Sequence, residues 1–129
     1  MGFSLIEIML AVSLVSIILA LAVPSYRQYA ERSWRADAIG QLLTAAECQE
    51  RVFARVGAYD TTRCTTGFNT SHYRFRFEPE ASTSSTGFTV IAQPKSHSND
   101  PCGTLGLDQA GTRSIGGSAD MLRKCWEGR

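Results

Sequence analysis

The sequence predicts an α+β fold, in which one long N-terminal helix packs on a three- or four-stranded antiparallel sheet. An apolar run and then apolar residues at helical spacing occupy the chain as far as Val56. From Tyr59 onward, apolar residues instead alternate with polar ones, which is the period of a half-buried strand. The length of 129 residues suits one domain, and no internal repeat is present.

The N-terminal apolar run predicts a helix that crosses a membrane. From Phe3 to Val23 the chain carries a single formal charge, that of Glu7. At about 1.5 Å per residue the run spans roughly 31 Å, close to the hydrocarbon thickness of a bilayer. No Lys or Arg precedes the run, whereas a secretory signal peptide needs a basic leading region. A retained membrane span is therefore favoured over a removed signal peptide.

Glu7 is the unusual residue of this span. An ionisable side chain in a membrane costs on the order of 3 kcal/mol, so it usually has a partner. Glu7 either lies near the helix end, where it reaches the interface or is neutral, or it meets a positive group. The nearest such group is the amine that a cut just before Phe3 would create.

Behind the span, residues 25–57 are predicted to form a second, amphipathic half of the same helix. Apolar residues recur there at three- and four-residue steps, and polar residues fill the other positions. Pro24, at the junction, has no backbone N–H and predicts a kink or local melting of the helix. Gly57 follows Val56 as a helix C-cap does.

Residues 58–129 form the predicted sheet head. Tyr73, Phe75 and Phe77 alternate with charged residues, which predicts a strand with one apolar and one charged face. Further strands are expected at 88–92, at 105–107 and, after a turn at 109–111, up to Ile115.

The head has four cysteines near or within it, Cys48, Cys64, Cys102 and Cys125, which allow three disulfide pairings. There is no C-x-x-C and no histidine at zinc-ligand spacing, so no metal site is predicted. Outside the cytoplasm, disulfides are the expected state. The favoured pairing, Cys48–Cys64 and Cys102–Cys125, would fasten the helix end to the following loop and the last strands to the C-terminal segment.

No convergent catalytic set is found, so neither an enzyme nor a cofactor is predicted. The chain has no G-x-S-x-G, no H-E-x-x-H and no glycine-rich phosphate loop. His72 and His97 lie in polar contexts that are typical of solvated histidines. Ser98, Asn99 and Asp100 offer oxygens to a calcium ion but lack the regular ligand spacing of a calcium loop.

Basic side chains of the head suggest a ligand. Arg74 and Arg76 alternate along a predicted strand, and Arg113, Arg123 and Lys124 follow in the C-terminal segment. If all shared the outer sheet face, they would form a patch for DNA phosphates. The net charge of +1 and the neighbouring acidic residues favour a solvated sheet face, so DNA is the less favoured partner.

The N-terminus resembles that of type IV pilins, in Gly2-Phe3-Ser4-Leu5-Ile6-Glu7, the apolar run and Pro24-Ser25-Tyr26. In that family a prepilin peptidase cuts after the glycine and the new N-terminal Phe is N-methylated. The resemblance implies cleavage between Gly2 and Phe3, methylation of Phe3, and pairing of Glu7 with the amine of a neighbouring subunit. Residues 1–2 would then be the remnant of a leader, although family leaders normally contain basic residues. Residues 3–24 would be the membrane and filament-core helix.

The C-terminal segment is similar to the disulfide-bounded region of these pilins. The stretch Cys102–Thr112 (CGTLGLDQAGT), ending at Cys125-Trp126, most resembles the PilE-type minor pilins, and Trp126 is expected to be exposed. The resemblance implies a minor pilin, placed first in the bacterial inner membrane and then in an extracellular filament for motility, adhesion or DNA uptake. Its partners would be other pilins, the prepilin peptidase and the inner-membrane assembly machinery. A pseudopilin of a type II secretion system, and an anchored periplasmic module with a basic binding face, are the alternatives.

Overall fold

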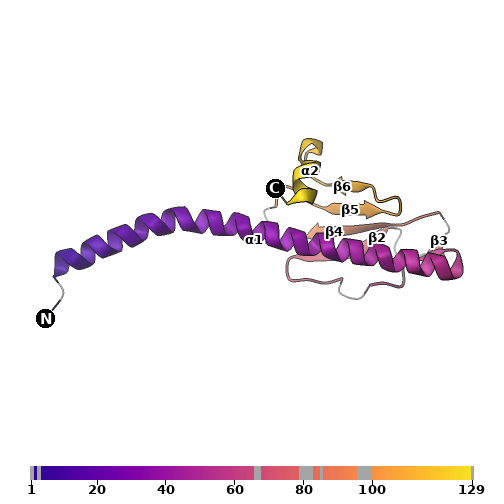
Figure 1. Ribbon diagram of the computed structural model, residues 1–129, viewed down its shortest axis with the longest axis horizontal. Coiled ribbons are helices and arrows are strands. Elements are labelled where there is room, and N and C mark those ends of the chain that lie inside the picture. The colour runs from indigo at the N-terminus through magenta and orange to yellow at the C-terminus, as the bar shows by residue number, and fades with distance from the viewer. Residues whose placement is uncertain are drawn as a thin grey trace. The chain divides into compact units, whose positions relative to one another are not determined.

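The computed structural model describes residues 2, 4–65, 68–78, 83–84, 86–95 and 100–128. The chain divides into two compact units, Met1–Glu31 and Arg32–Arg129, and helix α1 (Leu5–Val56) contributes to both. The other elements are, in chain order, β1 (Tyr59–Asp60), β2 (Tyr73–Glu78), β3 (Thr83–Ser84), β4 (Thr89–Pro94), β5 (Leu105–Asp108), β6 (Arg113–Ile115), a 3-10 turn (Ala119–Met121) and α2 (Leu122–Glu127) (Figure 1).

The first unit contains the apolar half of α1. An 18-residue window has a mean hydropathy of 2.7 and is 0% buried, so this helix is long and apolar enough to cross a membrane. The hydroxyls of Ser13 and Ser16 donate to the carbonyl oxygens of Met9 and Val12, at 2.7 and 2.8 Å, and so add no unpaired polar group to the surface. The helix continues through Pro24, and a kink at that residue stays a prediction.

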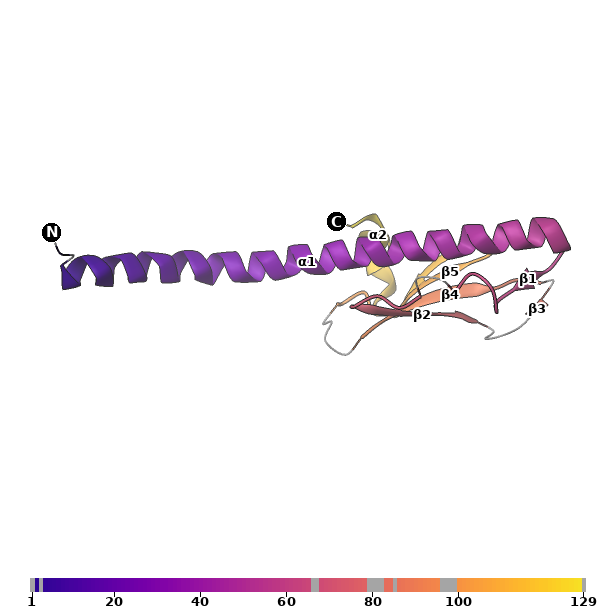
Figure 2. The same ribbon diagram turned by 90° about the horizontal axis from the view of Figure 1, so that it is seen from below.

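In the second unit, α1 buries one stripe of side chains against the sheet. The stripe consists of Arg35, Ala38, Leu42, Ala45 and Gln49, which recur at three- and four-residue steps. The helix lies along one face of the sheet (Figure 2). It ends as predicted, because Gly57 has a left-handed φ of 75° and donates its N–H to the carbonyl oxygen of Phe53 at 2.8 Å.

The main sheet has four antiparallel strands in the order β2-β4-β5-β6, and β1 and β3 form a separate two-stranded sheet. Strand β2 shows the predicted alternation of buried and exposed residues. The register places Phe75, Ala92, Leu105 and Ile115 in one row across the four strands. Since cross-strand partners share a face, this row marks the face that packs on α1 in the common core. The predicted α+β fold is confirmed.

A buried ion pair joins α1 to the start of the C-terminal segment. Arg35 donates from Nη2 to Oδ1 of Asp100 at 2.7 Å and from Nε to Oδ2 at 3.0 Å. The Tyr73 hydroxyl and the Cys102 N–H also donate to this carboxylate, at 2.7 and 3.0 Å. Burial alone raises the pKa of Asp100, but these hydrogen bonds and the Arg35 charge outweigh it and hold the pKa below its ordinary value. The carboxylate is therefore committed to protein donors, and Ser98 and Asn99, the other two residues considered for calcium, lie outside the described residues.

Candidate functional site

The apolar half of α1 is the most extensive candidate interface. Every described side chain from Ser4 to Tyr29 is exposed, among them Leu14 at 61% and Leu21 at 74%. Glu7 lies in the first turn of the helix, and none of the ion pairs among the described residues includes it. Phe3 lies outside the described residues, so cleavage and methylation there stay predictions.

The five basic residues that would form a patch if they shared the outer sheet face do not share it. Arg113 is paired with Leu107, whose side chain is in the core, so Arg113 stands on the inner face at the β6 edge. Arg74 and Arg76 alternate with the buried aromatic residues of β2 and therefore point to the outer face. Strands β2 and β6 are also the two opposite edges of the sheet. One patch of all five, the less favoured alternative from the sequence, does not form, because residue order along the chain does not give strand order or face.

Arg74 and Arg76, which we call the outer-face pair, lie in different surroundings. Arg76 forms an ion pair with Glu78, Nη2 to Oε1 at 2.9 Å, which offsets part of its charge. Arg74 lines a hollow of about 460 Å³ together with Thr65, Phe68, Asn69 and Phe75.

The C-terminal basic group consists of Arg113, Arg123 and Lys124, all exposed. The Arg113 guanidinium carbon lies 5.2 Å from the ring centroid of Trp126, and Arg123 and Lys124 are on the same short helix as that ring. Trp126 is 8% exposed and donates from Nε1 to the carbonyl oxygen of Ser114 at 3.2 Å. The expectation that Trp126 is exposed was wrong, because α2 folds against β6 and seats the ring there.

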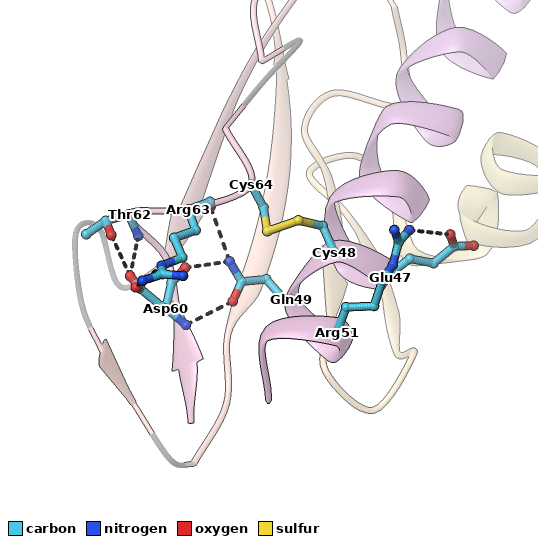
Figure 3. Close-up of a disulfide and its surroundings, with 8 residues drawn as sticks. All are labelled: Glu47, Cys48, Gln49, Arg51, Asp60, Thr62, Arg63 and Cys64. Carbon is cyan, nitrogen blue, oxygen red and sulfur yellow. Dashed lines mark hydrogen bonds and ion pairs between the residues drawn. A yellow bond between two sulfur atoms is a disulfide. The ribbon is translucent and has the colours of Figure 1, made fainter. Parts of the chain in front are cut away.

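Two disulfides are present in the structure. Cys48–Cys64 joins α1 to the loop after β1 (Figure 3), with a Cα–Cα distance of 5.8 Å. Cys102–Cys125 joins the segment before β5 to α2, also with a Cα–Cα distance of 5.8 Å. The second is the C-terminal disulfide expected of the pilin-like region.

Comparison with known proteins decides among the alternatives. A family model described as "Type IV minor pilin ComP, DNA uptake sequence receptor" matches residues 24–106. The chain belongs to this family of type IV minor pilins. A type IV pilin from Shewanella oneidensis is similar in structure, with a TM-score of 0.53 and 32% identity over 64% of this chain and 89% of that one. The Neisseria meningitidis minor pilin PilV shares the fold, with a TM-score of 0.55 and 21% identity over 71% of this chain and 92% of that one. No curated protein matches the chain in sequence.

Membership of the family makes this minor pilin a pilus subunit and confirms the predicted pilin class. Its fold and family are structural rather than enzymatic. The matched family is that of ComP, whereas the sequence had suggested the PilE type. Among the described residues, no group of three or more His, Cys, Asp or Glu side chains is arranged to hold a metal ion.

Besides the Arg35–Asp100 pair, two contacts of the minor pilin were missed from the sequence. His72 is half-buried and stacks on Trp34, with ring centroids 3.6 Å apart and an interplanar angle of 12°, so the expectation of a solvated histidine was wrong for His72. His97 lies outside the described residues. Gln49 is fully buried and binds the loop after α1. Its place in the apolar stripe of α1 was the available signal, because a polar residue on a core face needs an internal partner.

Proposed function

We propose that this minor pilin binds duplex DNA at the pilus surface through its C-terminal basic group, Arg113, Arg123 and Lys124. The family description supports the ligand, since it names a receptor for a DNA uptake sequence. One structural observation supports the position of the binding site. The three exposed cations lie on the adjoining elements β6 and α2, and no ion pair formed within the described residues includes any of them. Cations that form no ion pair with the described residues are available to DNA phosphates, whose counterions they displace.

The protein beneath Arg113 is held together by a hydrogen bond and a disulfide. The Arg113 guanidinium lies over the ring of Trp126, whose indole N–H donates to the carbonyl oxygen of Ser114, and the adjacent Cys125 is bonded to Cys102. A guanidinium over an aromatic face keeps its N–H donors in its own plane and free for a phosphate. Fixing the side chain beforehand also lowers the entropy lost on binding. The outer-face pair is less suitable, because Glu78 already binds Arg76.

Fluorescence anisotropy of a labelled duplex, measured with the full chain in detergent over a salt series, tests this proposal. We expect the variant R113A/R123A/K124A to bind at least about tenfold more weakly, and the slope of log K against log salt to fall by roughly 2–3. The matched control, R74A/R76A, should bind within about twofold of the parent. The reverse pattern would move the site to the outer face, and equal binding by all three proteins would contradict both sites.

For entry into the filament, we propose that a prepilin peptidase cuts between Gly2 and Phe3 after insertion in the inner membrane. Phe3 is then methylated, and Glu7 pairs with the N-terminal amine of a neighbouring pilin within the assembly machinery. The support is energetic: Glu7 is a lone carboxylate on an otherwise apolar, unburied helix face, and such a group needs a cation where water is excluded.

The level of the protein in sheared filaments tests this pairing. Glu7→Gln should lower it at least about tenfold, because loss of an ion pair away from water costs more than about 1.4 kcal/mol. Asp37→Asn, on the exposed face of α1 in the head, should leave it unchanged. Mass spectrometry of the parent should find a peptide that begins at Phe3 with one added methyl group. Normal filament levels of the Glu7 variant would rule out the pairing.

A further inference from the structure

The two disulfides lie in different surroundings. Cys102 and Cys125 are 1% and 0% exposed and belong to the core. Cys48 and Cys64 are half-buried, and both line a hollow of about 120 Å³ with Gln41, Thr44, Ala45 and Phe68. A thiolate must reach a sulfur atom in order to attack it, so this hollow gives an approach that the buried disulfide lacks.

The backbone conformation of Cys64 is also energetically unfavourable. Its φ is 67°, and it is the non-glycine residue with positive φ among those that the structure describes. The left-handed region is costly for a residue with a Cβ, and it persists where surrounding contacts impose it. Opening the bond to Cys48 removes one of these constraints and lets Cys64 return to an ordinary conformation.

The loop before Cys64 has a second attachment to α1, independent of the disulfide (Figure 3). Gln49 donates from Nε2 to the carbonyl oxygens of Asp60 and Arg63, at 2.7 and 3.2 Å, and accepts from the Asp60 N–H at 3.0 Å. The Asp60 carboxylate in turn binds Thr62 and Arg63. These bonds hold the chain up to Arg63 in place when the disulfide is open.

We infer that Cys48–Cys64 is a thiol–disulfide exchange site, reduced by a small dithiol in the folded protein while Cys102–Cys125 stays oxidised. A thiolate of the dithiol attacks one sulfur of the bond, the S–S bond breaks, and the other cysteine leaves as a thiolate that takes up a proton. The second thiolate of the dithiol then displaces the first cysteine from the mixed disulfide. Two electrons and two protons reach the protein, and the dithiol becomes a cyclic disulfide.

Reduction releases the backbone at Cys64 and Thr65, while Gln49 still holds the turn before them. Further along, Phe68 stays bound to β2, since it accepts from the Phe75 N–H at 3.1 Å and its ring contacts Phe75 and Phe77. Thr65 lines the hollow beside Arg74, so reduction changes one wall of that hollow and leaves the C-terminal basic group unchanged.

A time course with dithiothreitol tests the inference on the full chain in detergent, with free thiols alkylated by iodoacetamide and located by mass spectrometry. We expect Cys48 and Cys64 to be alkylated at least about tenfold faster than Cys102 and Cys125. Amide hydrogen exchange of the partly reduced protein should stay slow at Asp60, whose N–H is bound by Gln49. Equal rates for the two disulfides, faster reduction of Cys102–Cys125, or reaction only after unfolding would overturn the inference.

A matched pair of variants tests the approach through the hollow. Thr44→Trp places a large side chain at its wall and should slow reduction of Cys48–Cys64 at least about fivefold. Ala54→Trp makes the same change at an exposed helix position that does not line the hollow, and should leave the rate unchanged. Reduction of the Thr44 variant at the parent rate would contradict access by this route.

Discussion

The two halves of helix α1 bury their side chains in different places. In the first unit every described side chain up to Tyr29 is exposed, although the segment is almost wholly apolar. In the second unit the same helix buries a stripe that includes Ala38, Leu42 and Ala45 against the sheet. An apolar surface needs cover from lipid or from protein. The first half must find that cover outside its own chain, and this is what a pilus subunit does with its neighbours.

Only the second half is thus part of the stability of the isolated head. The polar contacts of the two halves of α1 follow the same division. The Arg35–Asp100 pair and Gln49 are buried and fully bonded in the head, whereas Glu7 has no ion pair among the described residues. Changes in the head should therefore alter folding, and changes in the apolar half should alter assembly.

The largest effect on folding is expected at Asp100. Asp100→Ala leaves Arg35 charged and unpaired, with the side chains of the pair only 7% and 0% exposed in the parent, which costs about 3–5 kcal/mol. Urea unfolding of the full chain in detergent, followed by tryptophan fluorescence, measures the loss. The double variant R35M/D100L should be less destabilised, because it leaves no lone charge. A loss below about 1 kcal/mol in Asp100→Ala would show that the pair is not needed to hold α1 on the sheet.

A matched pair of leucines tests the comparison directly. Leu42 is 0% exposed and Leu14 is 61% exposed, and both lie on α1. Leu42→Ala should lower the free energy of unfolding of the head by about 2–5 kcal/mol through lost burial and a cavity. Leu14→Ala should leave it within about 0.5 kcal/mol and should lower the level in filaments instead. Equal losses of head stability in both variants would contradict the division between the two halves.

A smaller effect is expected from acid. Since the pKa of Asp100 is lower in the folded protein than in the unfolded chain, the unfolded chain takes up the proton first. The stability contributed by Asp100 is therefore complete above the unfolded-state value of about 4 and is lost as the pH falls through the folded-state pKa. Urea midpoints measured from pH 7 down to pH 2.5 should fall steeply in the parent and less steeply in Asp100→Asn.

Asp60 adds to this acid effect in the same direction. Hydrogen bonds from the Thr62 hydroxyl and N–H, together with Arg63, lower its pKa and outweigh the opposing effect of burial. Asp60→Asn is thus the control that separates the contribution of the loop to the pH dependence of stability from the contribution of the buried pair. If Asp60→Asn and not Asp100→Asn removed the pH dependence, the loop rather than the buried pair would be the acid-sensitive contact.

Much of the fold could be predicted from local pattern. The alternation of Tyr73, Phe75 and Phe77 identified β2, and Gly57 marked the end of α1, because these features depend on neighbours within a few residues. Two of the contacts that were missed join parts of the chain that are far apart in sequence. Arg35 meets Asp100 across 65 positions, and the stacking of Trp34 on His72 likewise needs the helix to lie on the sheet. No spacing along the chain gives such pairs.

The class of the protein follows from the sequence pattern alone, which has a membrane-length apolar helix with one early carboxylate, an amphipathic continuation and an alternating head. These properties follow from hydropathy and period, which each segment carries alone. Which cations share a surface depends instead on how the strands pair in the folded head. Strand order placed Arg74 and Arg113 on opposite edges, and the register turned them to opposite faces. Faces and edges of a sheet are set by how strands pair, which is a property of the folded chain as a whole.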